Sequence, residues 1–177
     1  LARLANQSGA TIISVNYQKA PEHPFPIPFD DCYSTLEWVL AHAEELKIDP
    51  NRLGVAGDSA GANLASAVAL KARDNKIELA FQLLVYPCNG RDFTTPSYLE
   101  KEVGYGLTTQ GMKWFWDAYL QGDQHDTNPY AVPMVASSFK GVAPAIIITA
   151  EYDPLLSDGE KYAKLLERDA VTVTYSQ

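Results

Sequence analysis

The sequence predicts an α/β fold, in which a mostly parallel, doubly wound sheet carries helices on both faces. Short apolar segments rich in β-branched residues alternate with longer segments of helical periodicity, and this alternation is typical of βαβ units. The chain has 177 residues, of which 46% are hydrophobic and 20% are charged. This length and composition are those of one globular domain with a sizeable core.

The first part of the chain combines a helix end, a strand and a second helix. Residues 1–9 have the pattern of the last turns of a helix, with a glycine as the C-terminal stop. Residues 11–17 are β-branched or aromatic with almost no charge, which predicts a strand buried on both faces. Prolines spread over residues 21–28 predict an extended, rigid connection. The helix that follows is expected to be capped by Asp30 or Asp31.

Four further strands and two further helices complete the predicted alternation. Residues 52–64 predict a short strand, a sharp turn and a helix of small residues. Residues 79–86 and 145–149 are almost entirely apolar and predict two buried strands. A helix over residues 158–168 and a strand over residues 171–175 follow.

Ser59 stands at the predicted turn between the strand and the helix of residues 52–64. Gly57 and Gly61 flank it at two residues on either side, which gives the pattern Gly-x-Ser-x-Gly. This pattern is typical of a nucleophile elbow, which holds a serine hydroxyl at the edge of a parallel sheet. We expect a Cβ at either glycine to clash with neighbouring backbone. An ordinary Gly/Ser turn is the alternative, and the predicted strand and helix around Ser59 make it less favoured.

Charge and cysteine content exclude several classes of partner. The net charge is −8, which argues against nucleic acid and anionic lipid because both require a basic surface. No apolar run approaches the length of a membrane span.

Cys32 and Cys88 lack the spacing of a metal site. A disulfide between them stays open as an alternative, although two reduced cysteines fit a cytoplasmic protein at least as well.

Three separated motifs resemble the hormone-sensitive-lipase-like branch (family IV) of the α/β-hydrolase fold. Residues 16–26 contain Tyr-Gln-Lys-Ala-Pro-Glu-His, similar to the Tyr-x-x-Ala-Pro-Glu-His segment of this family. Residues 57–61 resemble its nucleophile motif, and residues 153–159, with Asp-Pro-Leu-Leu-Ser-Asp-Gly, resemble its catalytic-acid motif. The order and spacing of the motifs are also those of the family. The resemblance implies a carboxylesterase that needs no cofactor and no metal.

The chain departs from the family at several points. Gln18 and Lys19 stand where the family usually has Arg and Leu, and Ala62 often is glycine in relatives. The upstream His-Gly-Gly-Gly loop, which donates to the oxyanion in the family, is not in this sequence. The catalytic histidine that follows the acid in the family is also missing. We therefore expect residues 1–177 to be a partial α/β-hydrolase domain from a longer protein.

The motifs assign roles to individual residues. Ser59 is the predicted nucleophile, and the backbone N–H of Ala60 is the predicted oxyanion donor because it follows the nucleophile at a helix N-terminus. Asp153 is the predicted acid, since it follows a strand at the edge where ligands bind in open α/β sheets. Glu151 is a neighbouring rival. Asp158 is expected to cap the following helix, and Asp58 is expected to make a local hydrogen bond.

None of the three histidines is a convincing base for Ser59. In this fold the triad follows the order serine, acid, histidine, and His23, His42 and His125 all precede Asp153. We expect His23 to be structural, His42 to be solvated on a helix and His125 to lie on a surface loop. The catalytic histidine is expected beyond residue 177, so the isolated chain should be nearly inactive.

Residues 91–140 interrupt the alternation with turns around one aromatic helix at residues 109–120. This helix is unusually rich in aromatic side chains, among them Trp114, Phe115 and Trp116. It can pack on the rim of the sheet, line an acyl pocket as a lid-like insertion, or do both.

Two functions are therefore carried forward. The first is a hydrolase that forms an acyl-enzyme on small to medium acyl esters, and the second is a catalytically silent relative that binds a ligand in the same pocket. A serine peptidase of similar fold is a weaker third reading, because the Ala-Pro-Glu-His-Pro segment favours the esterase branch. The isolated chain is also expected to present an unpaired sheet edge, through which two copies can associate as a homo-oligomer.

Overall fold

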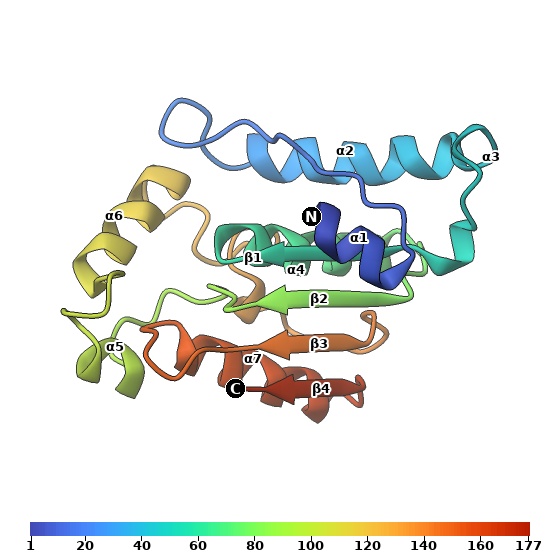
Figure 1. The fold of residues 1–177 in the computed structure, drawn as a ribbon. Helices are drawn as coiled ribbons and strands as arrows, with labels where there is room; N and C mark the ends of the chain where they lie inside the picture. The colour runs from blue at the N-terminus through green and yellow to red at the C-terminus, as the bar shows by residue number, and fades with distance from the viewer.

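A four-stranded parallel sheet forms the centre of the computed structural model, which describes all of residues 1–177 (Figure 1). The strands lie side by side in chain order. They are β1 (Gly54–Asp58), β2 (Phe81–Val85), β3 (Ala145–Ile148) and β4 (Val173–Ser176). The sequence predictions of these four strands are confirmed, with ends that differ by a few residues.

The two long helices that follow β1 and β3 cover one face of this sheet. They are α4 (Ala60–Asp74) and α7 (Leu156–Arg168). Leu84 and Ile147 are neighbours in register and fully buried under these helices. On the opposite face Phe81, Ile146 and Ile148 are 38–40% exposed. The predicted parallel sheet with packed helices is therefore confirmed, and its two long helices α4 and α7 share one face (Figure 1).

The segment at residues 11–17 differs from its prediction as a buried strand. The preceding helix α1 (Ala2–Ser8) ends as expected, at Gly9 with a left-handed φ of 70°. Residues 11–17 then form no strand, and most of their side chains are exposed. Their backbone makes no backbone hydrogen bond to any of the four strands. A β-prone sequence forms a strand only beside a partner, and this segment has none in the chain.

Helix α2 (Ile27–Ala41) begins earlier than the two aspartates that were expected to cap it. Pro26 is its N-cap residue and Pro28 occupies its first turn, where a missing N–H costs no hydrogen bond. Asp30 and Asp31 therefore lie inside the helix. Asp31 instead accepts hydrogen bonds from the backbone N–H of Gln18 at 2.8 Å and from its side-chain amide at 3.4 Å. The residues before α2 close in turns, so the predicted extended connection is also wrong.

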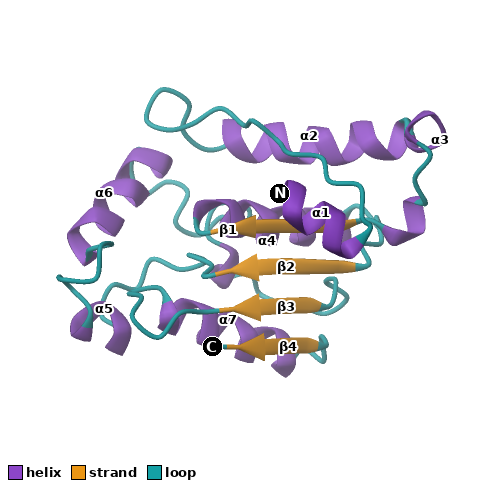
Figure 2. Cartoon of the chain, in the orientation of Figure 1, coloured by secondary structure: helices purple, strands orange, loops and turns teal.

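Two short elements follow α2, and a long segment separates β2 from β3. The short elements are α3 (Ala43–Leu46) and the 3-10 helix η1 (Pro50–Arg52). The long segment contains α5 (Pro96–Glu100), α6 (Thr109–Leu120) and the 3-10 helix η2 (Pro133–Val135). Figure 2 shows α5 and α6 beyond the tips of the strand arrows, at the carboxyl edge of the sheet. None of these helices is long and apolar enough to cross a bilayer.

Helix α6 packs on one side and exposes aromatic rings on the other. Trp116 is only 3% exposed, whereas Trp114 and Phe115 are 57% and 52% exposed. The carbonyl of Tyr119 accepts the backbone N–H of Phe25 at 2.8 Å, and the two rings meet edge to face. Helix α6 therefore packs against the segment before α2, at the carboxyl edge of the sheet (Figure 2), and its role as a lid stays a prediction.

Candidate active site

Ser59 occupies a strained turn between β1 and α4. Its backbone has φ 53° and ψ −119°, a conformation that residues other than glycine rarely adopt and that costs about 1–3 kcal/mol. Its N–H donates to the carbonyl of Val85 on β2 at 2.9 Å, which ties the turn to the sheet. Serine at an N-cap position usually bonds the helix backbone, but the Ser59 hydroxyl makes no such bond. The Ser59 hydroxyl is therefore not used to cap α4.

Only one of the two flanking glycines is required by close packing. A Cβ on Gly57 would lie 2.1 Å from the carbonyl oxygen of Gly61 and 2.6 Å from the backbone nitrogen of Ala62. A Cβ on Gly61 would meet nothing within 4 Å. The prediction is thus confirmed for Gly57 and wrong for Gly61, because it is the backbone of Gly61 that fills the space beside Gly57.

The backbone N–H of Ala60 makes no hydrogen bond within the protein. It belongs to the first residue of α4, where N–H groups lack intrahelical partners. The next N–H groups that bond, those of Ala62 and Asn63, donate to the carbonyl of Ser59 at 3.0 and 3.1 Å. An unpaired N–H at the positive end of a helix, one residue from the serine, suits a developing oxyanion.

Asp153 lies half-buried in the loop between β3 and α7. Its Oδ1 accepts the backbone N–H of Leu155 at 2.8 Å, and its carbonyl accepts the N–H of Leu156 at 3.1 Å. Burial raises the pKa of this carboxyl, against the opposing effects of the Leu155 N–H and the Lys101 ammonium. The other carboxylate oxygen has no hydrogen-bond partner in the chain and can accept one.

The predicted nucleophile and acid follow strands that end at the same edge. Asp58 of β1 pairs in register with Val85 of β2, and Val85 pairs with Ile148 of β3. Ser59 follows the first of these three aligned positions directly, and Asp153 comes five residues after the last. Neighbouring strands lie about 4.8 Å apart, so the two strand ends are separated by about 10 Å. Ser59 and Asp153 therefore lie on loops at the same edge of the sheet, two strands apart, and their roles stay predictions.

The rival carboxylates have other environments. Glu151 and Asp58 are exposed, and neither side chain makes a hydrogen bond, so the local bond expected for Asp58 is absent. Asp158 is fully buried in the first turn of α7 but does not cap it. Its carboxyl accepts the N–H of Gly90 at 3.4 Å, and burial raises its pKa to about 8. The expected cap is therefore wrong, because the helix begins two residues earlier and the side chain turns inward.

No histidine of the chain reaches Ser59 or Asp153 by a hydrogen bond. The ring of His42 stacks on Trp38, and its Nδ1 lies 2.8 Å from the Trp38 carbonyl oxygen. The ring of His125 packs edge to face on Phe25 with centroids 4.9 Å apart. His23 is half-buried in the turns before α2. His42 is thus half-buried and stacked on a ring, rather than fully solvated as expected. His125 lies in the loop after α6, as expected, and is half-buried against Phe25.

Sequence reasoning missed a second strained residue at this edge. Tyr86 follows β2, the strand between those of Ser59 and Asp153, and has a positive φ of 38°. Its N–H donates to the carbonyl of Ile148 at 2.6 Å. Residues other than glycine that adopt strained backbone conformations are concentrated at functional sites. Pro87, which directly follows Tyr86, is the one local signal in the sequence.

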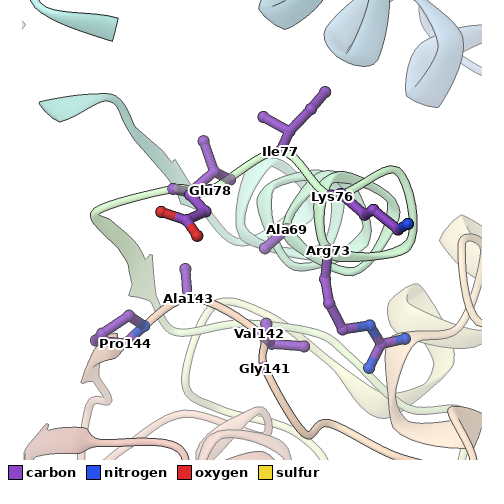
Figure 3. Close-up of a pocket in the computed structure, with 10 residues that line it drawn as sticks. Ala69, Arg73, Lys76, Ile77, Glu78, Gly141, Val142, Ala143 and Pro144 are labelled. Carbon is purple, nitrogen blue, oxygen red and sulfur yellow. The ribbon is translucent and has the colours of Figure 1, made fainter. Parts of the chain in front are cut away.

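Neither thiol supplies a reactive group to this edge, and the pocket described next lies apart from it. Cys32 and Cys88 are both free, and burial raises their pKa values to about 11 and about 12. No three His, Cys, Asp or Glu side chains gather as metal ligands would. A pocket of about 390 Å³ lies between Arg73, Glu78 and Pro144, which Figure 3 draws as sticks. It lies where β2 and β3 begin, at the opposite edge from Ser59.

Comparison with known proteins agrees with this architecture. A family model described as the alpha/beta hydrolase fold matches residues 1–177. The carboxylesterase NlhH of Mycobacterium tuberculosis is 40% identical over 171 residues, which cover 94% of this chain and 54% of that protein. The arylesterase of Saccharolobus solfataricus is 36% identical over 178 residues, covering 97% and 57%.

A solved structure extends the likeness to three dimensions. The crystal structure of DphMB1 matches with a TM-score of 0.94 at 44% sequence identity, and the match covers 98% of this chain and 58% of that one. The chain thus spans a little over half the length of each of these three proteins. The match with esterases of this fold confirms the resemblance carried by the three motifs. Residues 1–177 therefore belong to the family of proteins with the α/β-hydrolase fold.

Proposed function

We propose that residues 1–177 carry the nucleophile and the acid of a carboxylic ester hydrolase. The observation that carries the proposal is the state of Ser59, whose hydroxyl sits at an N-cap yet makes no cap bond, on backbone strained to φ 53°. The hydroxyl of a serine that served only as an N-cap would accept a hydrogen bond from an N–H group of the helix backbone. The names of the two relatives above, a carboxylesterase and an arylesterase, support the same reaction.

The proposed reaction passes through an acyl-enzyme. Ser59 Oγ attacks the ester carbonyl carbon while an imidazole takes its proton, and the carbonyl oxygen becomes an oxyanion facing the Ala60 N–H. The intermediate collapses, the C–O bond to the alcohol breaks, and the imidazolium returns the proton to the alcohol. Water then attacks the acyl group in the same way, which releases the acid and restores Ser59. Asp153 orients the imidazole and stabilises its charged form.

The imidazole is proposed to come from outside residues 1–177. His42 and His125 are held against aromatic rings, and His23 makes no hydrogen bond to either site residue. Removal of the base from a serine hydrolase costs on the order of 10⁶ in turnover. The isolated 177-residue chain is therefore predicted to hydrolyse esters at a rate lower by about that factor than the complete protein.

Hydrolysis of p-nitrophenyl acetate, butyrate and octanoate by the complete protein that carries these residues tests the proposal. Ser59→Ala is expected to lower kcat by on the order of 10⁶ and Asp153→Asn by about 10⁴. Glu151→Gln, an exposed carboxylate two residues from Asp153, is the matched control and should retain wild-type kcat. Retention of most activity in Ser59→Ala would overturn the proposal. A wild-type protein that binds these esters but hydrolyses none would favour the silent ligand-binding alternative.

A further inference from the structure

The turn that carries Asp153 leads into a helix without a cap of its own. Helix α7 has Leu155 at its N-cap position, and no side chain of the turn bonds the first N–H groups of the helix. The Asp153 side chain does not bond the helix, because its Oδ1 accepts the N–H of Leu155, the residue before the helix. Unpaired N–H groups at a buried helix start are costly, so a partner from another part of the chain is required.

Ser97 of α5 supplies that partner from 60 residues away in the sequence. Its Oγ accepts the backbone N–H of Ser157, in the first turn of α7, at 3.0 Å. The same hydroxyl donates to the carbonyl oxygen of Pro154 at 2.5 Å. In return, the backbone N–H of Ser97 donates to Ser157 Oγ at 3.3 Å. One hydroxyl thus bonds the helix start and the residue directly after Asp153.

These bonds are shielded from water. Ser97 is 2% exposed and Ser157 is 7% exposed, while Pro154 and Leu155 are also buried. Buried hydrogen bonds of this kind hold geometry firmly, because breaking one leaves polar groups without water as a replacement partner. The turn of Asp153 is therefore fixed on one side by its own backbone and on the other by α5.

We propose that Ser97 is a positioning residue, which acts on ester hydrolysis only by fixing the Asp153 turn. The inference rests on the proposed function, because it takes Asp153 as the acid that orients the imidazole. Loss of the Ser97 hydroxyl frees the Pro154 carbonyl and the Ser157 N–H, and the Asp153 carboxylate then samples positions away from the imidazole. A displacement of about 1 Å in a catalytic group can cost about 100-fold in rate.

A double-mutant cycle in the complete protein tests this proposal. Ser97→Ala is expected to lower kcat for p-nitrophenyl butyrate by about 10- to 100-fold with KM changed by less than about twofold. In the Asp153→Asn background the same substitution is expected to change kcat by less than about twofold, because the group it positions is already gone.

Ser66→Ala is the matched control for a lost buried hydroxyl. Ser66 is fully buried, donates to the Ala62 carbonyl at 2.9 Å and accepts from Asn89 at 2.8 Å, so it also both donates and accepts. It is expected to lower Tm to a similar extent as Ser97→Ala, with kcat within about twofold of wild type. If Ser97→Ala does not fold, Ser97→Cys keeps a weak donor and should show the same pattern with a smaller loss.

The outcomes separate this proposal from the proposed function. An equal loss of kcat on Ser97→Ala in the wild-type and Asp153→Asn backgrounds, with Asp153→Asn itself strongly impaired, would overturn the positioning role alone. A rise in KM at unchanged kcat would also overturn it. Full activity of Asp153→Asn would overturn both the assigned acid and the role of Ser97.

Discussion

A Cβ on Gly57 would lie 2.1 Å from the carbonyl oxygen of Gly61, so the last part of β1 and the first turn of α4 touch backbone to backbone. This contact makes the turn at Ser59 sharp enough to hold the serine in its strained conformation. The two glycines differ, because a Cβ on Gly61 would meet nothing within 4 Å.

Gly57→Ala is therefore expected to destabilise the protein by about 3 kcal/mol, since neither backbone can move without disrupting β1 or α4. Gly61→Ala is the matched control, and it should be neutral or stabilise by about 0.5–1 kcal/mol because it lies in a helix. Urea unfolding of both variants measures the difference. Equal stability losses would show that the two glycines are packed alike, contrary to the structure.

The strain at Ser59 predicts a trade-off between stability and activity. Ser59→Gly should raise the free energy of unfolding by about 1 kcal/mol, because glycine adopts φ 53°, ψ −119° without a steric penalty. Ser59→Ala keeps a Cβ and the backbone strain, so its free energy of unfolding should match that of the wild type. Both variants lack the hydroxyl and should be equally inactive. Thermal unfolding of the two variants compares them, and equal Tm values would contradict the strained conformation.

Local motifs explain why the turns and helix start of the candidate site could be predicted from sequence. Ser59, Ala60 and Asp153 lie in short segments whose turns and helix starts are determined by the residues next to them. The four strands were predictable for the same reason, since runs such as residues 145–149 are apolar and β-branched. These features depend on contacts within a few positions of the chain.

The features that sequence reasoning missed depend on distant partners. Residues 11–17 have the composition of a strand, yet no strand of the chain pairs with them. Ser97 looks like any serine in a loop-rich segment, and only the fold brings it to Pro154 and Ser157. Asp158 was assigned as a cap from its place before a helical pattern, whereas tertiary packing buries it.

The buried carboxyl of Asp158 predicts a pH-dependent stability. Burial raises its pKa to about 8; the Gly90 N–H and the Lys161 ammonium oppose this shift, and the Asp92 and Asp153 carboxylates add to it. Between about pH 4 and pH 8 the folded protein therefore holds a proton that the unfolded chain has released. The contribution of this group to stability is fully present below pH 4 and falls as the pH rises to about 8.

Asp158→Asn removes this dependence, because the amide does not titrate. The difference in unfolding free energy, variant minus wild type, is expected to rise between pH 5 and pH 8, by at most about 1.4 kcal/mol per pH unit. Urea unfolding at pH 5, 6, 7 and 8 gives this difference directly. A difference that stays constant over this range would mean that Asp158 titrates normally in the folded protein.

Fluorophosphonate labelling of the complete protein, with the modified peptide mapped by mass spectrometry, tests most directly whether Ser59 is an activated nucleophile. The reagent forms a stable adduct only with a serine whose hydroxyl is deprotonated by a base and whose oxyanion site is formed. One adduct, located on Ser59 and lost in Ser59→Ala, is the predicted result. An adduct on a different residue, or an active esterase that carries no label on Ser59, would contradict it.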